Sequence, residues 1–367
     1  DTTKSPVGPD PRFPANMPVA PFDAAQYVKP EDRTGDLVHR YYQEQYQIDG
    51  GKMDKFVAWS DAAGLVLSYY DATNMPEGKL AQQYVLADNF FHAAFGGSFL
   101  NHFWLVCACT PVWASAPDAV KAQMDATGMM VKDGQVTPDG YAINTSYTVN
   151  QPHPVEMDPA RLVPNQTAPN IGDRLDEKGI SWAWYAGGWN DAVSGHPDPL
   201  FQFHHHPFAY FARYADGTAG RAQHLKDEQD YWAALRDGKL PAVAFVKPLG
   251  PDNEHPGYTN LMRGQQHVLE LVAAVMNSPY WKDTAIIITY DEHGGRWDHV
   301  APPKVDRWGP GARVPAIIVS PFAKRRYVDH TQYDTTAILK LIETRWGLKP
   351  LGSRDAGAGD LRNAFNF

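Results

Sequence analysis

The sequence predicts an α/β fold, arranged as a three-layer α/β/α sandwich around a central, mostly parallel sheet. Apolar runs of strand length alternate with helical patterns through the second half of the chain, as in parallel strands joined by crossover helices. The run at 284–290 is continuously apolar and β-branched, which predicts a strand buried on both faces. The 367 residues show no repeat and no shift in composition, so we expect a single domain over 1–367.

Periodicity, capping residues and terminal glycines predict the helices. The segment 115–128 has the most complete set of signals, with a Ser cap, an early Pro and a final Gly. The expected helices are 36–49, 76–88, a buried helix beginning at Ser98, 115–128, 171–178, one containing 231–235, 265–276 and 331–346.

Short apolar runs bounded by turn residues predict the strands. They lie at 180–185, 242–246, 284–290 and 314–319. A hairpin is expected around 133–134, because Asp-Gly separates two short apolar pairs there. The long polar segment that follows is expected to be a loop.

Composition excludes several classes of protein. Hydrophobic residues make up 43% and charged residues 20% of the chain, the values of a soluble globular protein. The net charge of -9 argues against a nucleic-acid binder and a polybasic membrane surface. No apolar run reaches the roughly 18 residues of a membrane span. Cys107 and Cys109 are too close in sequence to bridge comfortably, and they leave the redox compartment open.

The strongest candidate site follows the strand at 284–290. Asp291 and Glu292 come directly after it, where open α/β sheets place ligands. Two adjacent carboxylates repel each other unless a cation or strong donors lie between them. Carboxylate oxygens suit several divalent metals, so the sequence predicts a metal site without identifying the metal. An acidic turn is the alternative.

A second candidate is Ser98, which follows two glycines. A helix that begins there would point backbone N–H groups and a positive dipole end at an anion. A base, a metal or the helix N-terminus could activate its hydroxyl as a nucleophile. By itself the pattern is more typical of a helix cap. Asn101, one turn later, could donate to the same anion, or could be a helix-surface amide.

Histidines form the third set of candidates. His39, His205 and His255 lie in separate segments, and His206 adjoins the second of them. An imidazole can bind phosphate oxygens or protonate a leaving group around pH 5–7. Taken singly, each histidine is more typical of a hydrogen-bonded structural residue.

These segments together resemble the bacterial phosphoesterase family, which contains respiratory-burst-inhibiting acid phosphatases and non-specific phospholipases C of the alkaline-phosphatase superfamily. The resemblance is carried by GGSFLNHFW at 96–104 and TYDEHGGRWDHVAPP at 289–303. The segments 39–51, 205–208, 254–256 and 311–321 fit the family pattern in the same order. The resemblance covers most of the chain from Asp36 onward.

The resemblance implies a role for each candidate. Ser98 matches the family's metal-bound nucleophile, which becomes phosphorylated, and Asp291 and Glu292 match its acidic ligands of one divalent metal. His39, His205 and His255 match the histidines of the phosphate pocket, where Asn101 and His206 would contact substrate. The implied function is that of an acid phosphatase acting on phosphate monoesters in the bacterial periplasm or outside the cell. A phospholipase C or other phosphodiesterase is the alternative.

One departure from the family pattern affects the metal site. Family members carry a Glu-Asn pair after a first, N-terminal strand, and no such pair precedes Asp36. Loss of a central strand would leave unpaired sheet edges. We therefore expect an additional N-terminal segment in the intact protein, either cleaved but still bound or absent from this sequence. If the pair is truly missing, a non-catalytic phosphate-binding protein is a further alternative.

Overall fold

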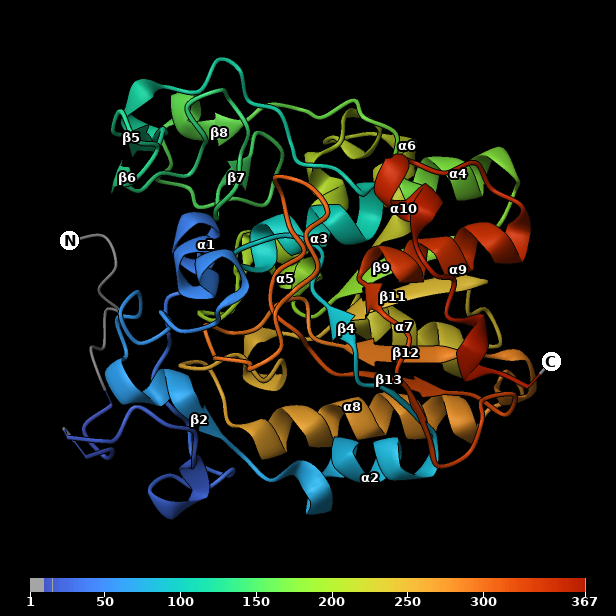
Figure 1. Cartoon of the computed structure of the whole chain (residues 1–367). Helices are drawn as coiled ribbons and strands as arrows, with labels where there is room; N and C mark the ends of the chain where they lie inside the picture. Colours follow the sequence, from blue (N-terminus) through green and yellow to red (C-terminus); the bar gives the residue numbers. More distant parts are fainter. Residues whose placement is uncertain (1–9, 15, 367) are drawn as a thin grey trace. The chain divides into compact units, whose positions relative to one another are not determined.

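The computed structural model describes residues 10–14 and 16–366 (Figure 1). The chain divides into two compact units, each assembled from separate stretches of sequence. Unit 1 contains the residues up to Gly96, then 250–338 and those from Gly359, whereas unit 2 contains 97–249 and 339–358. Each unit combines helices with a sheet, which confirms the predicted α/β class.

Unit 1 is built on a four-stranded mixed sheet in the order β12-β13-β3-β14. These strands are Ile286–Thr289, Ala316–Val319, Val85–Ala87 and Tyr327–Asp329. Strand β13 runs antiparallel to both β12 and β3, and β14 runs parallel to β3. Helices α2 (Pro76–Gln83) and α8 (Leu261–Met276) pack side by side, and α2 contacts β13 (Figure 1).

Strand β12 does not have the burial that its sequence predicts. All four of its residues are partly exposed, and its only partner among the described strands is β13. A strand with one neighbour leaves one edge of its backbone unpaired. The expectation of a strand buried on both faces is therefore wrong for the residues that the structure describes.

Unit 2 is built on a three-stranded sheet in the order β10-β9-β11, and all of its pairings are parallel. The strands are Leu225–Asp227, Trp182–Ala186 and Val243–Lys247. The central strand β9 is completely buried, and helices α6 (Ala219–His224) and α7 (Glu228–Arg236) contact it. This sheet has the parallel pairing that the alternating pattern predicts.

The remaining elements are short. The other helices are α1 (Tyr41–Ile48), α3 (Ser98–Cys107), α4 (Ile171–Glu177), α5 (Trp189–Val193), α9 (Thr336–Trp346) and α10 (Ser353–Gly357). Paired short strands are β1 (Phe22–Asp23) with β2 (Ser68–Tyr69), β4 (Phe90–Phe91) with β15 (Tyr333–Asp334), β5 (Gln123–Met124) with β6 (Met130–Lys132), and β7 (Tyr147–Thr148) with β8 (Leu162–Val163).

The predicted helix at 115–128 is wrong. The segment contains one 3-10 turn, Asp118–Val120, and then becomes strand β5 of a β5–β6 hairpin. The hairpin turns at 125–129 instead of 133–134, because Asp125 Oδ1 accepts hydrogen bonds from the backbone N–H groups of Thr127 and Met129. Gly128 supplies the positive φ of 83° that this turn needs.

Other helix predictions have the right type but displaced ends. Helix α1 begins at Tyr41 rather than 36, and α2 ends at Gln83, where the chain continues as β3. Helix α8 begins four residues early because the Asn260 side chain caps the N–H of Arg263. Helix α4 matches its prediction, with Asn170 and Asp173 forming a capping box.

The two cysteines form a disulfide, contrary to the expectation from their spacing. The Cys107 and Cys109 Cα atoms are 5.1 Å apart. Ala108 between them adopts a left-handed conformation, with φ 47° and ψ 37°, at the end of α3. This left-handed residue leaves the two Cα atoms within the separation that a disulfide needs.

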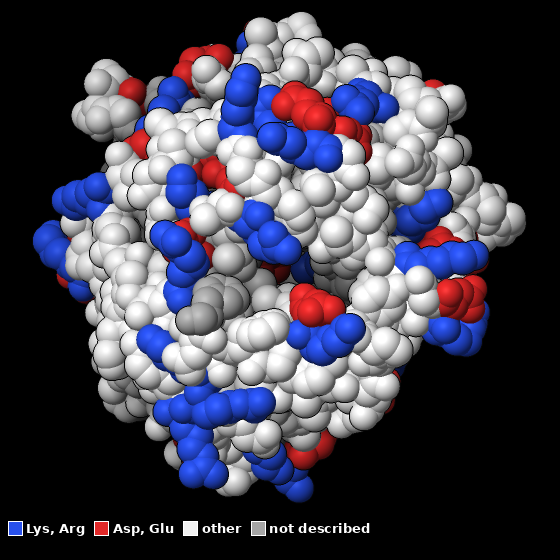
Figure 2. Space-filling model, turned by 90° about the vertical axis from the view of Figure 1, so that its right-hand side faces the viewer, with Lys and Arg blue, Asp and Glu red and all other residues white. Residues whose placement is uncertain are grey.

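Acidic and basic side chains are interspersed over the face of the molecule drawn in Figure 2. Among the described residues, no helix combines the length and the apolar character needed to cross a bilayer.

Candidate functional site

The predicted carboxylate pair lies directly after β12 in unit 1. Glu292 is buried, and its Oε2 accepts a hydrogen bond of 2.6 Å from the N–H of Gly294. Burial raises the pKa of Glu292. His39 lowers this pKa, whereas the negative charge of Asp291 raises it further. Gly295 has φ 74°, and a Cβ there would lie 2.7 Å from Leu37 Cβ. Glycine thus allows this turn to pack against the segment that carries His39.

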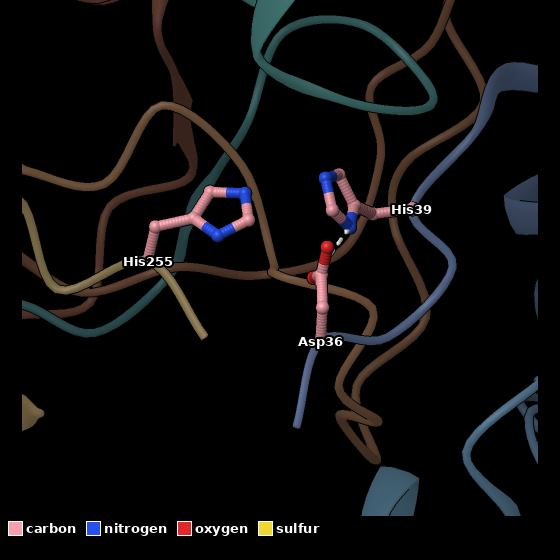
Figure 3. Close-up of side chains that lie close together, drawn as sticks. All are labelled: Asp36, His39 and His255. Carbon is pink, nitrogen blue, oxygen red and sulfur yellow. Dashed lines mark ion pairs between the residues drawn. The ribbon is translucent and has the colours of Figure 1, made fainter. Parts of the chain in front are cut away.

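His39 faces Asp36, as Figure 3 shows. It also lies close to Glu292. Its Nδ1 contacts the carbonyl oxygen of Leu37 and lies 3.8 Å from Asp36 Oδ1, and its Nε2 lies 3.8 Å from Glu292 Oε1. Burial alone would lower the pKa of His39. The negative charges of Glu292 and Asp36 outweigh burial and raise the pKa to about 9. His39 therefore carries a proton at neutral pH in the metal-free protein.

His255 has the opposite protonation state, although its ring lies 5.3 Å from that of His39 (Figure 3). Its Nδ1 donates to the carbonyl oxygen of Pro256, and its ring stacks on Tyr258 with centroids 3.9 Å apart. Burial and the positive charge of His39 lower its pKa to about 4. Its Nε2 is therefore an acceptor at neutral pH.

A pair of buried acids supports the segment that carries His255. Tyr290 donates a hydrogen bond of 2.7 Å to Glu254 Oε2, and Glu254 is paired with Glu77. Glu254 adopts a positive φ of 64°, and a Cβ on Gly264 would lie 2.2 Å from Glu254 Cγ. Burial and the charge of Glu254 raise the pKa of Glu77 to about 9. One proton shared by the two carboxyls thus holds together the residues next to His255 and Asp291.

We expect Glu77→Gln to flatten the dependence of stability on pH. Between pH 4.5 and 9 the folded protein retains a proton on Glu77 that the unfolded chain releases. The free energy of unfolding should consequently fall as pH rises through this window, by up to about 1.4 kcal/mol per pH unit. Urea unfolding from pH 5 to 9 should show this slope in the wild type and a smaller slope in Glu77→Gln, with the variant the more stable at pH 9.

Glu270→Gln is the matched control, because Glu270 is exposed on α8. Its pH profile should follow that of the wild type. Parallel profiles for Glu77→Gln and the wild type would refute the shared proton.

In unit 2, Ser98 is the first residue of α3, and Gly97 is its N-cap. The side chain of Ser98 is buried at the end of the helix that carries the positive dipole. The preceding Gly96 has φ 90°, and a Cβ there would lie 2.5 Å from the backbone N of Tyr41. Only glycine fits at position 96, because any side chain there would collide with the backbone of Tyr41.

Neighbours of Ser98 on α3 make local hydrogen bonds. Asn101 Nδ2 donates to the carbonyl oxygen of Gly97 at 3.2 Å, and His102 Nδ1 donates to the carbonyl oxygen of Ser98 at 2.6 Å. The ring of His205 stacks on that of His102 at 5.2 Å. His206 is fully buried against Trp189, with ring centroids 4.2 Å apart. Burial holds the pKa of His206 well below its usual value, so that ring is neutral.

The predicted residues thus fall into two groups, one in each unit. Asp291, Glu292, His39 and His255 come together in unit 1, and Ser98, Asn101 and His205 lie around the start of α3 in unit 2. Two potential metal-ligating groups of unit 1 contain residues that were not predicted from the sequence: Asp36, Glu44, His92 and His293. Two signals were present: Asp36 precedes His39 by three residues, and His293 follows Glu292 directly.

The donor atoms at the end of β12 fit a divalent metal. Adjacent carboxylates in a buried setting repel each other. Burial and the charge of Asp291 both raise the pKa of Glu292. Carboxylate oxygens are the ligands that hard divalent cations prefer. Asp291 and Glu292 are therefore the residues that would hold such an ion.

Comparison with known families identifies the chain. Residues 9–349 match the phosphoesterase family, a span that includes both groups of site residues. The chain belongs to the phosphoesterase family. This confirms the predicted family, and the expected phosphoric ester hydrolase agrees with it.

Curated relatives of this phosphoesterase-family chain are named as phospholipases C. The non-hemolytic phospholipase C of Pseudomonas aeruginosa is 24% identical over 95% of the chain and 50% of its own length. Phospholipase C B of Mycobacterium tuberculosis is 28% identical over 53% of the chain and 42% of its own length. Non-specific phospholipase C1 of Arabidopsis thaliana is 28% identical over 58% of the chain and 42% of its own length. The chain spans about half the length of these relatives, or less.

Among solved structures, the chain is similar to an alkaline phosphatase superfamily protein from Vibrio parahaemolyticus. The TM-score is 0.42 at 11% identity, over 95% of the chain and 75% of that protein. The comparisons give no support to a cleaved N-terminal segment, which stays a prediction.

Proposed function

We propose that the chain hydrolyses phosphate esters through a phosphoserine intermediate on Ser98. The observation that carries this proposal is the position of Ser98: a buried hydroxyl at the N-terminus of α3, after two glycines. Backbone N–H groups at a helix N-terminus stabilise the negative charge of a phosphoryl group. The proposal assigns Ser98 and the carboxylates of unit 1 to the same reaction, which is supported by a family match that covers both.

In the first step the Ser98 hydroxyl releases its proton to solvent, its Oγ attacks phosphorus, the bond to the ester oxygen breaks, and the leaving alcohol takes a proton from a histidine. Water then attacks the phosphoserine and releases inorganic phosphate. One hydrogen of this water restores the Ser98 hydroxyl, and the histidine regains its proton from solvent. A divalent metal held by Asp291 and Glu292 would act as a Lewis acid on the negative charge of the phosphoryl oxygens.

Protonation favours His39 over His255 as the proton donor. In the metal-free protein, His39 holds its proton up to a pKa of about 9, whereas His255 loses its proton at a pKa of about 4. A general acid must be protonated at the working pH. We propose that His39 donates to the leaving group, that His255 and His205 accept hydrogen bonds or bind phosphate oxygens, and that Asn101 and His206 contact or position substrate.

The His39 titration tests this arrangement directly. In metal-free protein, NMR should show a His39 midpoint near pH 9, because Glu292 and Asp36 favour the imidazolium. Addition of Mg²⁺, Mn²⁺ or Zn²⁺ should lower this midpoint, since a cation on Glu292 offsets the negative charge that raises it. Glu292→Gln should also lower the midpoint without any metal. A midpoint near 6.5 in the metal-free wild type would contradict the proposed charge on His39.

We consider two classes of substrate. Phosphate monoesters are the substrates expected from the resemblance to the acid-phosphatase branch, and the second candidate is a phospholipase C, which the names of the relatives favour. Rates on 4-nitrophenyl phosphate, bis(4-nitrophenyl) phosphate and phosphatidylcholine distinguish them. We expect release from the monoester to exceed that from the diester by at least tenfold. Faster turnover of phosphatidylcholine would favour the second candidate, and binding of phosphate without turnover of any substrate would refute both.

We also propose that both units form one phosphoesterase domain, because the family match runs through both. The Cys107–Cys109 disulfide supports a protein that works in an oxidising compartment, such as the periplasm or the exterior of a bacterium.

A further inference from the structure

Unit 1 contains a second group of converging side chains, which the proposed reaction does not use. Glu44 lies on α1, His92 directly follows β4, and His293 lies after β12. Glu44 and His92 have no exposed surface, and the His293 side chain is 2% exposed. One ligand atom from each of the three lies within 4.8 Å of the others. Such deep burial of three ionisable side chains requires compensation.

Backbone contacts define the hydrogen on each imidazole. His92 Nδ1 lies 2.8 Å from the carbonyl oxygen of Ala94, and His293 Nδ1 lies 3.1 Å from that of Arg296. A carbonyl oxygen only accepts, so both Nδ1 atoms carry hydrogen. In a neutral ring the Nε2 atom is then a bare lone pair. The two rings are stacked 5.2 Å apart at an interplanar angle of 5°, with both Nε2 atoms toward the same carboxylate.

Glu44 is held as a carboxylate in front of these lone pairs. Its Oε1 accepts from the N–H of Ala312 at 2.8 Å, and its Oε2 accepts from the N–H of Gly96 at 2.5 Å. Two backbone N–H donors to its carboxyl oxygens favour the charged form of Glu44. Glu44 Oε1 lies 2.9 Å from His92 Nε2 and 3.7 Å from His293 Nε2.

Protons alone do not satisfy this arrangement. A proton on His92 Nε2 would bond to Glu44, but His293 Nε2 is buried with no hydrogen-bond partner. A single divalent cation accepts both lone pairs and the carboxylate oxygen at once.

We propose that Glu44 Oε1, His92 Nε2 and His293 Nε2 bind a transition-metal ion of the zinc type, separate from the metal held by Asp291 and Glu292. Two imidazoles with one carboxylate favour zinc-like ions over magnesium or calcium. The Nδ1–H to carbonyl bonds of both histidines are the outer contacts that metal-bound histidines normally make. Tetrahedral zinc separates its nitrogen and oxygen ligands by about 3.3 Å, so His92 and Glu44 need to move apart by only a few tenths of an ångström.

The role of this ion is structural. It would join α1 to the segment after β4, which continues in the chain to Ser98, and to the turn after Glu292. The backbone around it is already packed closely: a Cβ on Gly311 would lie 2.4 Å from His92 Nε2 and 2.6 Å from Glu44 Oε1.

Metal binding in an Asp291→Asn background tests the proposal independently of activity. Apo protein of this variant is titrated with Co²⁺, and the same protein loaded with Zn²⁺ is analysed by mass spectrometry for metal content. We expect one tightly bound ion per chain and the intense visible absorption of tetrahedral Co²⁺. Adding His293→Ala or His92→Ala should lower Co²⁺ affinity by more than about 100-fold. His224→Ala is the control, because His224 is buried in unit 2 and donates to the carbonyl oxygen of Trp182.

Three results would overturn the proposal. These are no Co²⁺ or Zn²⁺ bound by Asp291→Asn protein, binding that persists in both added histidine variants, and ¹⁵N spectra of Zn²⁺-saturated protein in which His92 is doubly protonated. The last measurement uses an unaltered cluster and does not depend on the folding of the cluster variants. Failure of phosphatase activity alone would leave all three readouts intact, so the two proposals can fail separately.

Discussion

Ser98→Ala should lower turnover of 4-nitrophenyl phosphate by about 10⁴-fold or more, with the fold retained. The substitution removes the proposed nucleophilic oxygen, and alanine is compatible with the first position of α3. Labelled substrate quenched in acid should leave phosphate on Ser98 of the wild type and none on the variant. Turnover near the wild-type rate would refute the assignment of the nucleophile.

Ser353→Ala is a closely matched control. Ser353 is the first residue of α10 and also follows a glycine N-cap, but it is exposed. Its rate and its unfolding temperature should equal those of the wild type. If Ser353→Ala lost as much activity as Ser98→Ala, the effect would come from replacing serine at any helix N-terminus and not from loss of the nucleophile.

Glu292→Gln should have opposite effects on activity and on the stability of the metal-free protein. We expect turnover to fall by roughly 10²–10³-fold, because an amide is a poor ligand for the proposed metal. The metal-free variant should unfold at a higher temperature than metal-free wild type at pH 7, because burial and Asp291 disfavour the charge on Glu292. The glutamine oxygen can still accept from the N–H of Gly294.

Asp283→Asn is the control for this experiment, because Asp283 is an exposed acid shortly before β12. It should change neither the turnover rate nor the unfolding temperature of the metal-free protein. Chelation should destabilise the wild type and the control more than it destabilises Glu292→Gln, which keeps only the proposed ion on Glu44, His92 and His293. Undiminished activity in Glu292→Gln would rule out Glu292 as a metal ligand, and a lower unfolding temperature of the metal-free variant would show that its charge is stabilising.

Several helices and strands were predicted correctly because their signals lie close together in the sequence. The helix that begins at Ser98, the capped helix α4 and the parallel strands of unit 2 follow from local signals that tertiary packing reinforces. The segment 115–128 failed because its helical signals compete with Asp125, whose side chain bonds to the backbone of a turn. The disulfide was missed because spacing alone does not reveal that Ala108 reverses the chain.

The sequence by itself determined the family, the α/β class and which residue types carry the chemistry, because these depend on motifs whose residues are close together in the chain. Only the tertiary structure decided how those residues are charged. His39 and His255 look equivalent in the sequence, yet Glu292 and Asp36 raise one pKa while burial and His39 lower the other. Glu44, His92 and His293 are joined only by folding, since they are far apart in sequence and their lone pairs converge through backbone contacts of their own. Charge and convergence depend on distances in space, which sequence patterns do not encode.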